Sequence, residues 1–188
     1  MEENFDQKRT GCLRIVLFGP ESTGKTTMAK SLALHYNTQW VPEFARDYLQ
    51  QKWDNHKEVC SQEDLKIIAA GQIALENKAL QTANDFLFCD TNILVTQAWS
   101  ETHFDGYCDP LILRAAERFQ YDFYFLTDID VPWLSDDLRD SPNQRSQMFT
   151  HFKKLLNTYN CNYATLSGSH EERLKTANKI IKKLQSSQ

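Results

Sequence analysis

The sequence has no apolar run long enough to cross a membrane and no excess of basic residues. Its 188 residues include 21 lysines and arginines against 25 aspartates and glutamates, a formal net charge of -4. A membrane-spanning helix needs about 20 apolar residues in succession, and proteins that bind a nucleic-acid backbone carry clustered positive charge. We therefore expect neither a membrane span nor a nucleic-acid partner. Residues 1–12 are polar and are predicted to form a flexible tail, not a signal peptide.

Cysteine is scarce and scattered, and no C-x-x-C pair occurs. The five histidines show no metal-ligand spacing either. Zinc sites and disulfide frameworks need closely or regularly spaced ligands, so this pattern favours a reducing compartment and predicts a cytoplasmic protein. Oligomeric state leaves no signal in the composition. The cysteines are Cys12, Cys60, Cys89, Cys108 and Cys161.

Short apolar runs alternate with longer amphipathic segments along the chain. Five such alternations predict an α/β fold with three α/β/α layers around a five-stranded parallel sheet, because parallel strands are joined by helical crossovers. The length suits one domain, which we place at residues 13–186. The predicted strands are 13–18, 39–41, 86–89, 123–126 and 163–166. The predicted helices are 26–36, 44–52, 61–84, 93–101, 109–119, 144–160 and 171–184.

A phosphate-binding loop follows the first predicted strand. Residues 19–26, GPESTGKT, match the pattern G-x-x-x-x-G-K-[ST] between a strand and a helix, which is typical of a P-loop NTPase. The glycines let backbone N–H groups converge on phosphate oxygens, Lys25 supplies positive charge, and the Thr26 hydroxyl is a Mg²⁺ ligand. The loop therefore predicts binding of ATP and Mg²⁺. Its candidate residues are Gly19, Glu21, Ser22, Thr23, Gly24, Lys25, Thr26 and Thr27.

Two motifs of other P-loop classes are absent. The sequence has no N-K-x-D guanine-reading motif and no LSGGQ-like signature. Their absence disfavours a GTPase and an ATP-driven motor, and favours a small-molecule kinase. In open α/β sheets the acceptor site lies at the carboxyl ends of the strands, beside the P-loop.

Charged residues follow the second and third predicted strands. Glu43 and Arg46 lie three residues apart at a helix start, so they share a face. Glu43 is a candidate to bind sugar hydroxyls or accept a proton, and Arg46 to hold an anion; the alternative is a solvated helix start. Asp90 follows a buried strand at the position of a metal-ordering carboxylate, although an N-cap of the next helix is an alternative.

The segment 131–146 is rich in charge and proline and is predicted to form a lid over the site. Arg139 and Arg145 are candidates to contact the transferring phosphoryl group, or else to pair with neighbouring aspartates. We interpret Trp40, Trp53 and Trp99 as core or interface residues. The turn at 167–170 is a candidate contact for the nucleotide base.

Together these motifs resemble the ribosylnicotinamide kinase domain of the NadR family. The similarity covers residues 14–181 and includes GPESTGKTT, YNTQWVPEFARDYL, FCDTN, VTQAWSE and DDLRDSPNQR. The resemblance implies ATP-dependent phosphorylation of the 5'-hydroxyl of nicotinamide riboside to nicotinamide mononucleotide. It implies that Glu43 and Arg46 hold the riboside, that Asp90 serves the metal or the acceptor, and that Arg139 and Arg145 act from the lid.

The chain departs from this family in two respects. Asn92, a substrate-binding candidate together with Glu43, Arg46 and Asp90, stands where many relatives have an aspartate. This difference removes one carboxylate from the site. No H-x-G-H motif of an adenylyltransferase is present, so the chain is not expected to make NAD by itself. Two alternatives remain: a P-loop kinase for another nucleoside or nucleotide, and a non-catalytic module that senses ATP.

Overall fold

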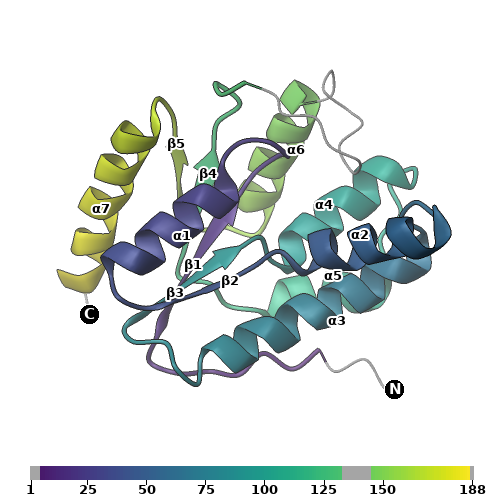
Figure 1. Cartoon of the computed structure of the whole chain (residues 1–188), viewed down its shortest axis with the longest axis horizontal. Coiled ribbons are helices and arrows are strands. Elements are labelled where there is room, and N and C mark those ends of the chain that lie inside the picture. The colour runs from purple at the N-terminus through teal and green to yellow at the C-terminus, as the bar shows by residue number, and fades with distance from the viewer. Residues whose placement is uncertain (1–4, 133–144, 187–188) are drawn as a thin grey trace.

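A computed structural model describes residues 5–132 and 145–186 and contains a parallel sheet flanked by helices (Figure 1). The five strands are all parallel and follow the order β2-β3-β1-β4-β5. The predicted fold class is therefore confirmed. The strands are β1 (Leu13–Phe18), β2 (Gln39–Val41), β3 (Phe86–Asp90), β4 (Phe123–Thr127) and β5 (Tyr163–Leu166).

Helices cover both faces of the sheet. One apolar cluster joins one face to α3, α4, α5 and α6, and a second joins the opposite face to α1 and α7. The helix α2 packs on α3. The helices are α1 (Lys25–His35), α2 (Phe44–His56), α3 (Gln62–Ala79), α4 (Ile93–His103), α5 (Pro110–Arg118), α6 (Arg145–Thr158) and α7 (His170–Ser186).

The central strand β1 is apolar on both sides, as a strand between two helical layers must be. Val16 and Phe18 belong to the first cluster, whereas Ile15 and Leu17 belong to the second, because successive side chains point to opposite faces. β1 pairs with both β3 and β4. Strands β2 and β3 lie on one side of β1, and β4 and β5 lie on the other. Because β1 and β3 are parallel neighbours, the segments that follow them meet at the carboxyl ends of the strands.

Two helix ends differ from the predicted ones by more than two residues. Helix α3 ends at Ala79, five residues before the predicted end, because residues 80–85 turn into β3. Helix α2 continues to His56 and ends where Lys57 adopts the left-handed conformation, with φ 55°. Residues 5–12 have no regular secondary structure but contact the domain, since Gln7 accepts a hydrogen bond from the Gln120 amide at 2.9 Å.

A carboxyl group is buried at the amino end of the sheet, away from the P-loop. Glu76 of α3 is fully buried and accepts hydrogen bonds of 3.0 and 3.1 Å from the Tyr121 hydroxyl. Burial raises the pKa of Glu76 to about 8, against the opposing effects of the Arg14 charge and the Tyr121 hydrogen bond. The group therefore keeps its proton in the folded protein at pH values where the unfolded chain has lost it.

Glu76→Gln is expected to stabilise the protein at pH 8 and to remove a pH dependence. Between pH 4.5 and about 8 unfolding releases the Glu76 proton, so the contribution of Glu76 to the free energy of unfolding falls with rising pH by about 1.4 kcal/mol per pH unit. Glutamine keeps the shape and an acceptor for Tyr121 without a titratable proton. Urea unfolding at pH 5, 6, 7 and 8 measures the slope, with the exposed Glu63→Gln on the same helix as control. An unchanged slope in Glu76→Gln would contradict this assignment.

None of the helices within the described ranges has the length and apolar character required to cross a membrane.

Candidate active site

One large cavity opens at the carboxyl edge of β1 and β3. Its volume is about 1120 Å³. Its wall comes from the P-loop, the start of α2, the end of β3, the helix α4, and the turn between β5 and α7. Segments that are far apart in the sequence therefore meet around one space large enough for two small molecules.

The P-loop backbone needs glycine at both of its predicted positions. Gly19 has φ 137°, and a Cβ atom there would lie 2.8 Å from the Thr127 hydroxyl and 3.0 Å from the Thr127 carbonyl oxygen. Gly24 has φ 85° and is the N-cap of α1. Only glycine adopts such angles without strain. The loop consequently curls over the end of β1 and leads directly into the amino terminus of α1.

The P-loop is braced by its own side chains and by β4. The Thr23 hydroxyl donates to the Pro20 carbonyl at 2.8 Å and lies 2.6 Å from the Thr127 hydroxyl. The Lys25 side chain is 8% exposed, and its ammonium donates to the Pro20 carbonyl at 2.8 Å. The loop therefore holds a positive charge beside the helix amino terminus, which is an arrangement suited to a phosphate group.

Asp90 lies at the end of β3 against the P-loop, as predicted. Its Oδ2 accepts a hydrogen bond from the Thr26 hydroxyl. Its Oδ1 is buried and has no hydrogen-bond partner among the described residues. Burial raises the pKa of Asp90 above its ordinary value, and the nearby charge of Lys25 opposes this effect. A buried carboxylate oxygen with no partner beside a threonine hydroxyl fits a Mg²⁺ ion or one of its waters.

Asn92 is not among the residues that line the cavity. Its side chain is buried, accepts a hydrogen bond from Leu94 N at 3.1 Å, and donates to the Tyr124 hydroxyl at 3.0 Å. It is thus the N-cap of α4. Asn92, and not Asp90, therefore caps the amino end of α4. The difference from relatives that have an aspartate at this position lies outside the cavity wall.

Glu43 and Arg46 both line the cavity, and α2, which they begin, lies across the molecule from the turn between β5 and α7 (Figure 1). Glu43 is the N-cap of α2. The start of α2 is held by Gln72 of α3, whose Oε1 accepts a hydrogen bond from Phe44 N at 2.9 Å. Gln72 also lines the cavity, and its buried Nε2 has no hydrogen-bond partner in residues 5–132 or 145–186. A carboxylate, a guanidinium and an amide therefore gather on this wall.

A second network holds α2 against α3 below this wall. Asp64 of α3 accepts hydrogen bonds of 2.7 Å from the Tyr48 hydroxyl and from the Lys52 ammonium. It also accepts one from Ser61 N, as the capping box requires. Burial alone would raise the pKa of Asp64, but the Lys52 and Ser61 contacts lower it to about 2. The ionised carboxylate thereby keeps the wall in place.

Aromatic side chains also line the cavity. The sequence predicts Trp40, Trp53 and Trp99 to be core or interface residues, and Trp40 and Trp99 do pack against the two apolar clusters. All three nevertheless line the cavity, together with Phe104. The Trp99 ring stacks on His103 with centroids 4.0 Å apart. The periodicity of a helix does not distinguish a buried tryptophan from one that borders a cavity, so no local signal indicated this lining.

The predicted lid is described only at its two ends. Arg139 lies outside the described residues. Arg145 begins α6 and donates hydrogen bonds to the Val131 carbonyl at 3.1 Å and to the Ser22 carbonyl at 3.3 Å. Arg145 therefore joins the start of α6 to the P-loop itself.

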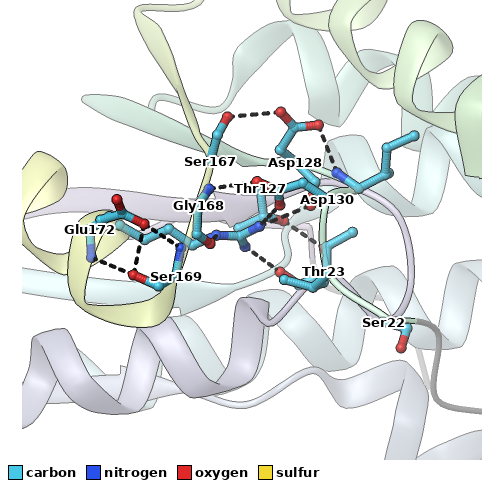
Figure 2. A network of polar contacts seen from close by, with 12 residues as sticks. Ser22, Thr23, Thr127, Asp128, Asp130, Ser167, Gly168, Ser169 and Glu172 are labelled. Carbon is cyan, nitrogen blue, oxygen red and sulfur yellow. Dashed lines mark hydrogen bonds and ion pairs between the residues drawn. The ribbon is translucent and has the colours of Figure 1, made fainter.

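The turn between β5 and α7 forms the other end of the cavity. Gly168, Ser169 and His170 line it, as does Arg173 from the first turn of α7. Figure 2 shows the turn residues beside Thr23 of the P-loop and Asp128 and Asp130 after β4. Arg173 was not indicated by any motif. The one available signal was its position in the sequence, three residues after the turn at 167–170 that is a candidate contact for the nucleotide base.

Comparison with known proteins identifies a family and relatives that are similar to this chain over part of their length. The model of the AAA_28 family, an AAA domain, matches residues 14–173. The trifunctional NAD biosynthesis/regulator protein NadR of Salmonella typhimurium is 29% identical over 125 residues, 66% of this chain. The predicted resemblance to NadR is thus confirmed. The match spans 30% of the length of that relative.

Solved structures agree on the fold. A crystal structure of NadR in complex with NR superposes with a TM-score of 0.73 at 17% identity, covering 90% of this chain and 48% of that one. A thymidylate kinase from Candida albicans superposes with a TM-score of 0.71 at 15% identity, covering 94% of each chain. At such identities the similarity establishes the shared fold.

Proposed function

This chain belongs to the AAA_28 family of AAA domains, and from that premise we propose that it is an ATP-dependent small-molecule kinase. The proposed reaction transfers the γ-phosphoryl group of ATP to the 5'-hydroxyl of nicotinamide riboside and forms nicotinamide mononucleotide. The observation that carries the proposal is the continuous cavity, which joins the P-loop to a wall bearing Glu43 and Arg46. A donor and an acceptor can therefore meet without leaving the site.

The P-loop half of the cavity is the proposed ATP site. Lys25 and the amino end of α1 supply positive charge for the β- and γ-phosphates. Thr26 and Asp90 would hold Mg²⁺, since one buried oxygen of Asp90 has no hydrogen-bond partner in the described part of the chain. When bound, Mg²⁺ neutralises charge on the transferring phosphoryl group.

Phosphate oxygens of the nucleotide and waters are proposed as the other metal ligands. Within residues 5–132 and 145–186, no three histidine, cysteine, aspartate or glutamate side chains cluster in a way that could hold a metal ion. Magnesium usually binds one or two protein oxygens together with phosphate oxygens and waters. The Thr26 and Asp90 pair is compatible with a metal that arrives with the nucleotide.

The opposite half of the cavity is the proposed acceptor site. Trp53, Trp99 and Phe104 offer flat apolar surfaces for a ring, and a positively charged ring such as the pyridinium of nicotinamide riboside gains from aromatic contacts. Glu43 suits the ribose hydroxyls or the proton of the attacking hydroxyl. Arg46 suits an anion, including the phosphate of the product.

In the transfer the protein forms no covalent bond to the phosphoryl group; it positions the reactants and stabilises charge. The acceptor oxygen forms a bond to the γ-phosphorus while the bond to the β–γ bridging oxygen breaks, and ADP leaves. In our proposal Glu43 orients the hydroxyl and takes its proton, and Lys25 neutralises charge on the phosphates. Arg145, which contacts the Ser22 carbonyl, supports the P-loop during the transfer, and Arg139 is proposed to act from the lid.

Nicotinamide riboside is the first acceptor to test because the NadR crystal structure that shares this fold is a complex with NR. The purified protein is incubated with Mg-ATP and a panel of nicotinamide riboside, nicotinic acid riboside and the common nucleosides, and products are identified by mass spectrometry. We expect phosphate to be added preferentially to nicotinamide riboside. A preference for another nucleoside would keep the kinase and reject this acceptor. No product despite ATP binding would favour the sensing module.

Glu43→Ala tests the acceptor side of the proposal. We expect kcat to fall by about a hundredfold, the usual effect of losing a general base, while the Kd of ATP changes little because Glu43 lies on the acceptor half. The measurement is a steady-state assay with calorimetric titration of ATP. The matched control is Glu117→Ala, at an exposed position of α5. Turnover unaffected by Glu43→Ala would reject the role of Glu43 in binding or activating the riboside.

A further inference from the structure

Arg173 is a buried arginine that the proposed chemistry does not use. It lies in the first turn of α7 and is 3% exposed. Its guanidinium donates from Nη1 to the Thr23 carbonyl at 2.7 Å and from Nε to the Gly168 carbonyl at 3.0 Å. Its Nη2 donates to the Asp128 carbonyl at 3.2 Å and pairs with the Asp130 carboxylate. Each of the three guanidinium nitrogens therefore donates at least one hydrogen bond.

These partners belong to three separate segments of the chain. Thr23 is in the P-loop, Asp128 and Asp130 follow β4, and Gly168 is in the turn between β5 and α7 (Figure 2). The Arg173 side chain thus links three segments through hydrogen bonds to their backbone carbonyls. A guanidinium suits this role because it is planar and presents five donors in a rigid fork.

Carboxylates also hold the turn between β5 and α7. Asp130 accepts a hydrogen bond from Gly168 N as well as from Arg173, and Asp128 accepts one from the Ser167 hydroxyl at 2.8 Å. Ser169 N donates to the Glu172 carboxylate at 2.8 Å. The turn is therefore held by ionic hydrogen bonds, which are stronger than neutral ones.

The P-loop and this turn line the same cavity, and Arg173 joins them directly. We propose that Arg173 is a positioning residue that sets the separation between the P-loop and the β5–α7 turn, so that one nucleoside triphosphate contacts both. Its phosphates bind the P-loop and its base lies against the turn. This inference rests on the ATP-binding part of the proposed function and is independent of the acceptor.

Two ligands separate a positioning role from a merely structural one. ATP carries phosphates and a base, whereas inorganic tripolyphosphate carries phosphates alone. If Arg173 aligns the two ends of the site, its loss weakens ATP binding more than tripolyphosphate binding. General destabilisation affects neither Kd at temperatures well below the melting temperature.

The experiment is calorimetric titration of both ligands, with Mg²⁺, into the unaltered chain and into Arg173→Met and Arg173→Lys. We expect the Kd of ATP to rise about tenfold in both variants, or about 1.4 kcal/mol. The Kd of tripolyphosphate should rise much less. Lysine should fail to rescue ATP binding because one ammonium cannot reach three segments at once.

Arg14→Met is the matched control for the loss of a buried arginine. Arg14 is 4% exposed and donates to the Lys8 carbonyl, before β1 and away from the nucleotide site. Its replacement should lower the melting temperature and leave both Kd values unchanged. If Arg173→Met does not fold, Asp130→Asn removes the charged acceptor and should shift the ratio of the two Kd values in the same direction to a smaller extent.

Three results would overturn the proposal: unchanged ATP binding in folded Arg173 variants, an equal loss for the two ligands, or an unchanged ratio in Asp130→Asn. Failure of the unaltered chain to bind ATP would overturn both this inference and the proposed function. ATP binding with the expected ratio, but without phosphorylation of any acceptor, would reject the kinase and support the role of Arg173.

Discussion

Asp90→Asn is expected to lower kcat by about a thousandfold, the upper range for the loss of one electrostatic group in an active site. The carboxylate is 1% exposed, contacts the Thr26 hydroxyl, and lies within the field of Lys25, Lys30 and Arg46. Asparagine has nearly the same shape but no charge to place opposite these cations or a Mg²⁺ ion. The Kd of ATP should change far less than kcat.

The measurement is kcat at saturating Mg-ATP and acceptor, together with the dependence of the rate on Mg²⁺ concentration. The variant should need more Mg²⁺ to reach its own maximum. Asp122→Asn is the control, because Asp122 accepts a hydrogen bond from Arg14 N at 2.7 Å at the other end of the sheet. If Asp90→Asn kept near-normal turnover with an unchanged Mg²⁺ requirement, the assignment of Asp90 would be wrong.

Lys25→Met is expected to produce a loss of similar size, about a thousandfold in kcat/KM for ATP. Methionine preserves much of the apolar stem and removes the only lysine charge inside the motif GPESTGKT. The P-loop backbone should persist, because Thr23 still contacts Pro20 and Thr127. The defect should therefore appear in phosphate binding and transfer, with little change in the free energy of unfolding.

Titration of ATP and of ADP distinguishes the role of the lysine. A charge that reaches the γ-phosphate should make ATP binding suffer more than ADP binding. Lys153→Met, at an exposed position of α6, controls for the change of net charge. A variant with equal losses for the two nucleotides would place the Lys25 ammonium away from the γ-phosphate.

Features that depend on local patterns were predictable from the sequence. The run Leu13–Phe18, the motif at 19–26 and the end of β3 at Asp90 lie where expected. Each is encoded by neighbouring residues: an apolar run, glycines at two positive φ angles, or a polar residue after a buried strand. Glu43, Arg46 and Asp90 converge because the carboxyl ends of parallel strands share one edge of the sheet.

Other parts of the site gave no local signal. Asn92 follows Asp90 by two residues, yet its side chain turns to Leu94 N and Tyr124 while Asp90 faces the P-loop. The tryptophans border a cavity that exists only once α2 and α4 are in place. Glu76 has an ordinary sequence context, and its pKa is raised because folding buries it.

The sequence by itself determined the phosphate-binding half of the cavity. A P-loop after the first strand needs only neighbouring residues: glycines that adopt positive φ angles and a lysine that supplies positive charge. The tertiary structure alone decided what lies opposite that loop. Arg173 reaches Thr23 across 150 positions of the chain, and such a contact costs loop-closure entropy that no local pattern records. It forms because the packing of α7 on the sheet brings the two segments together.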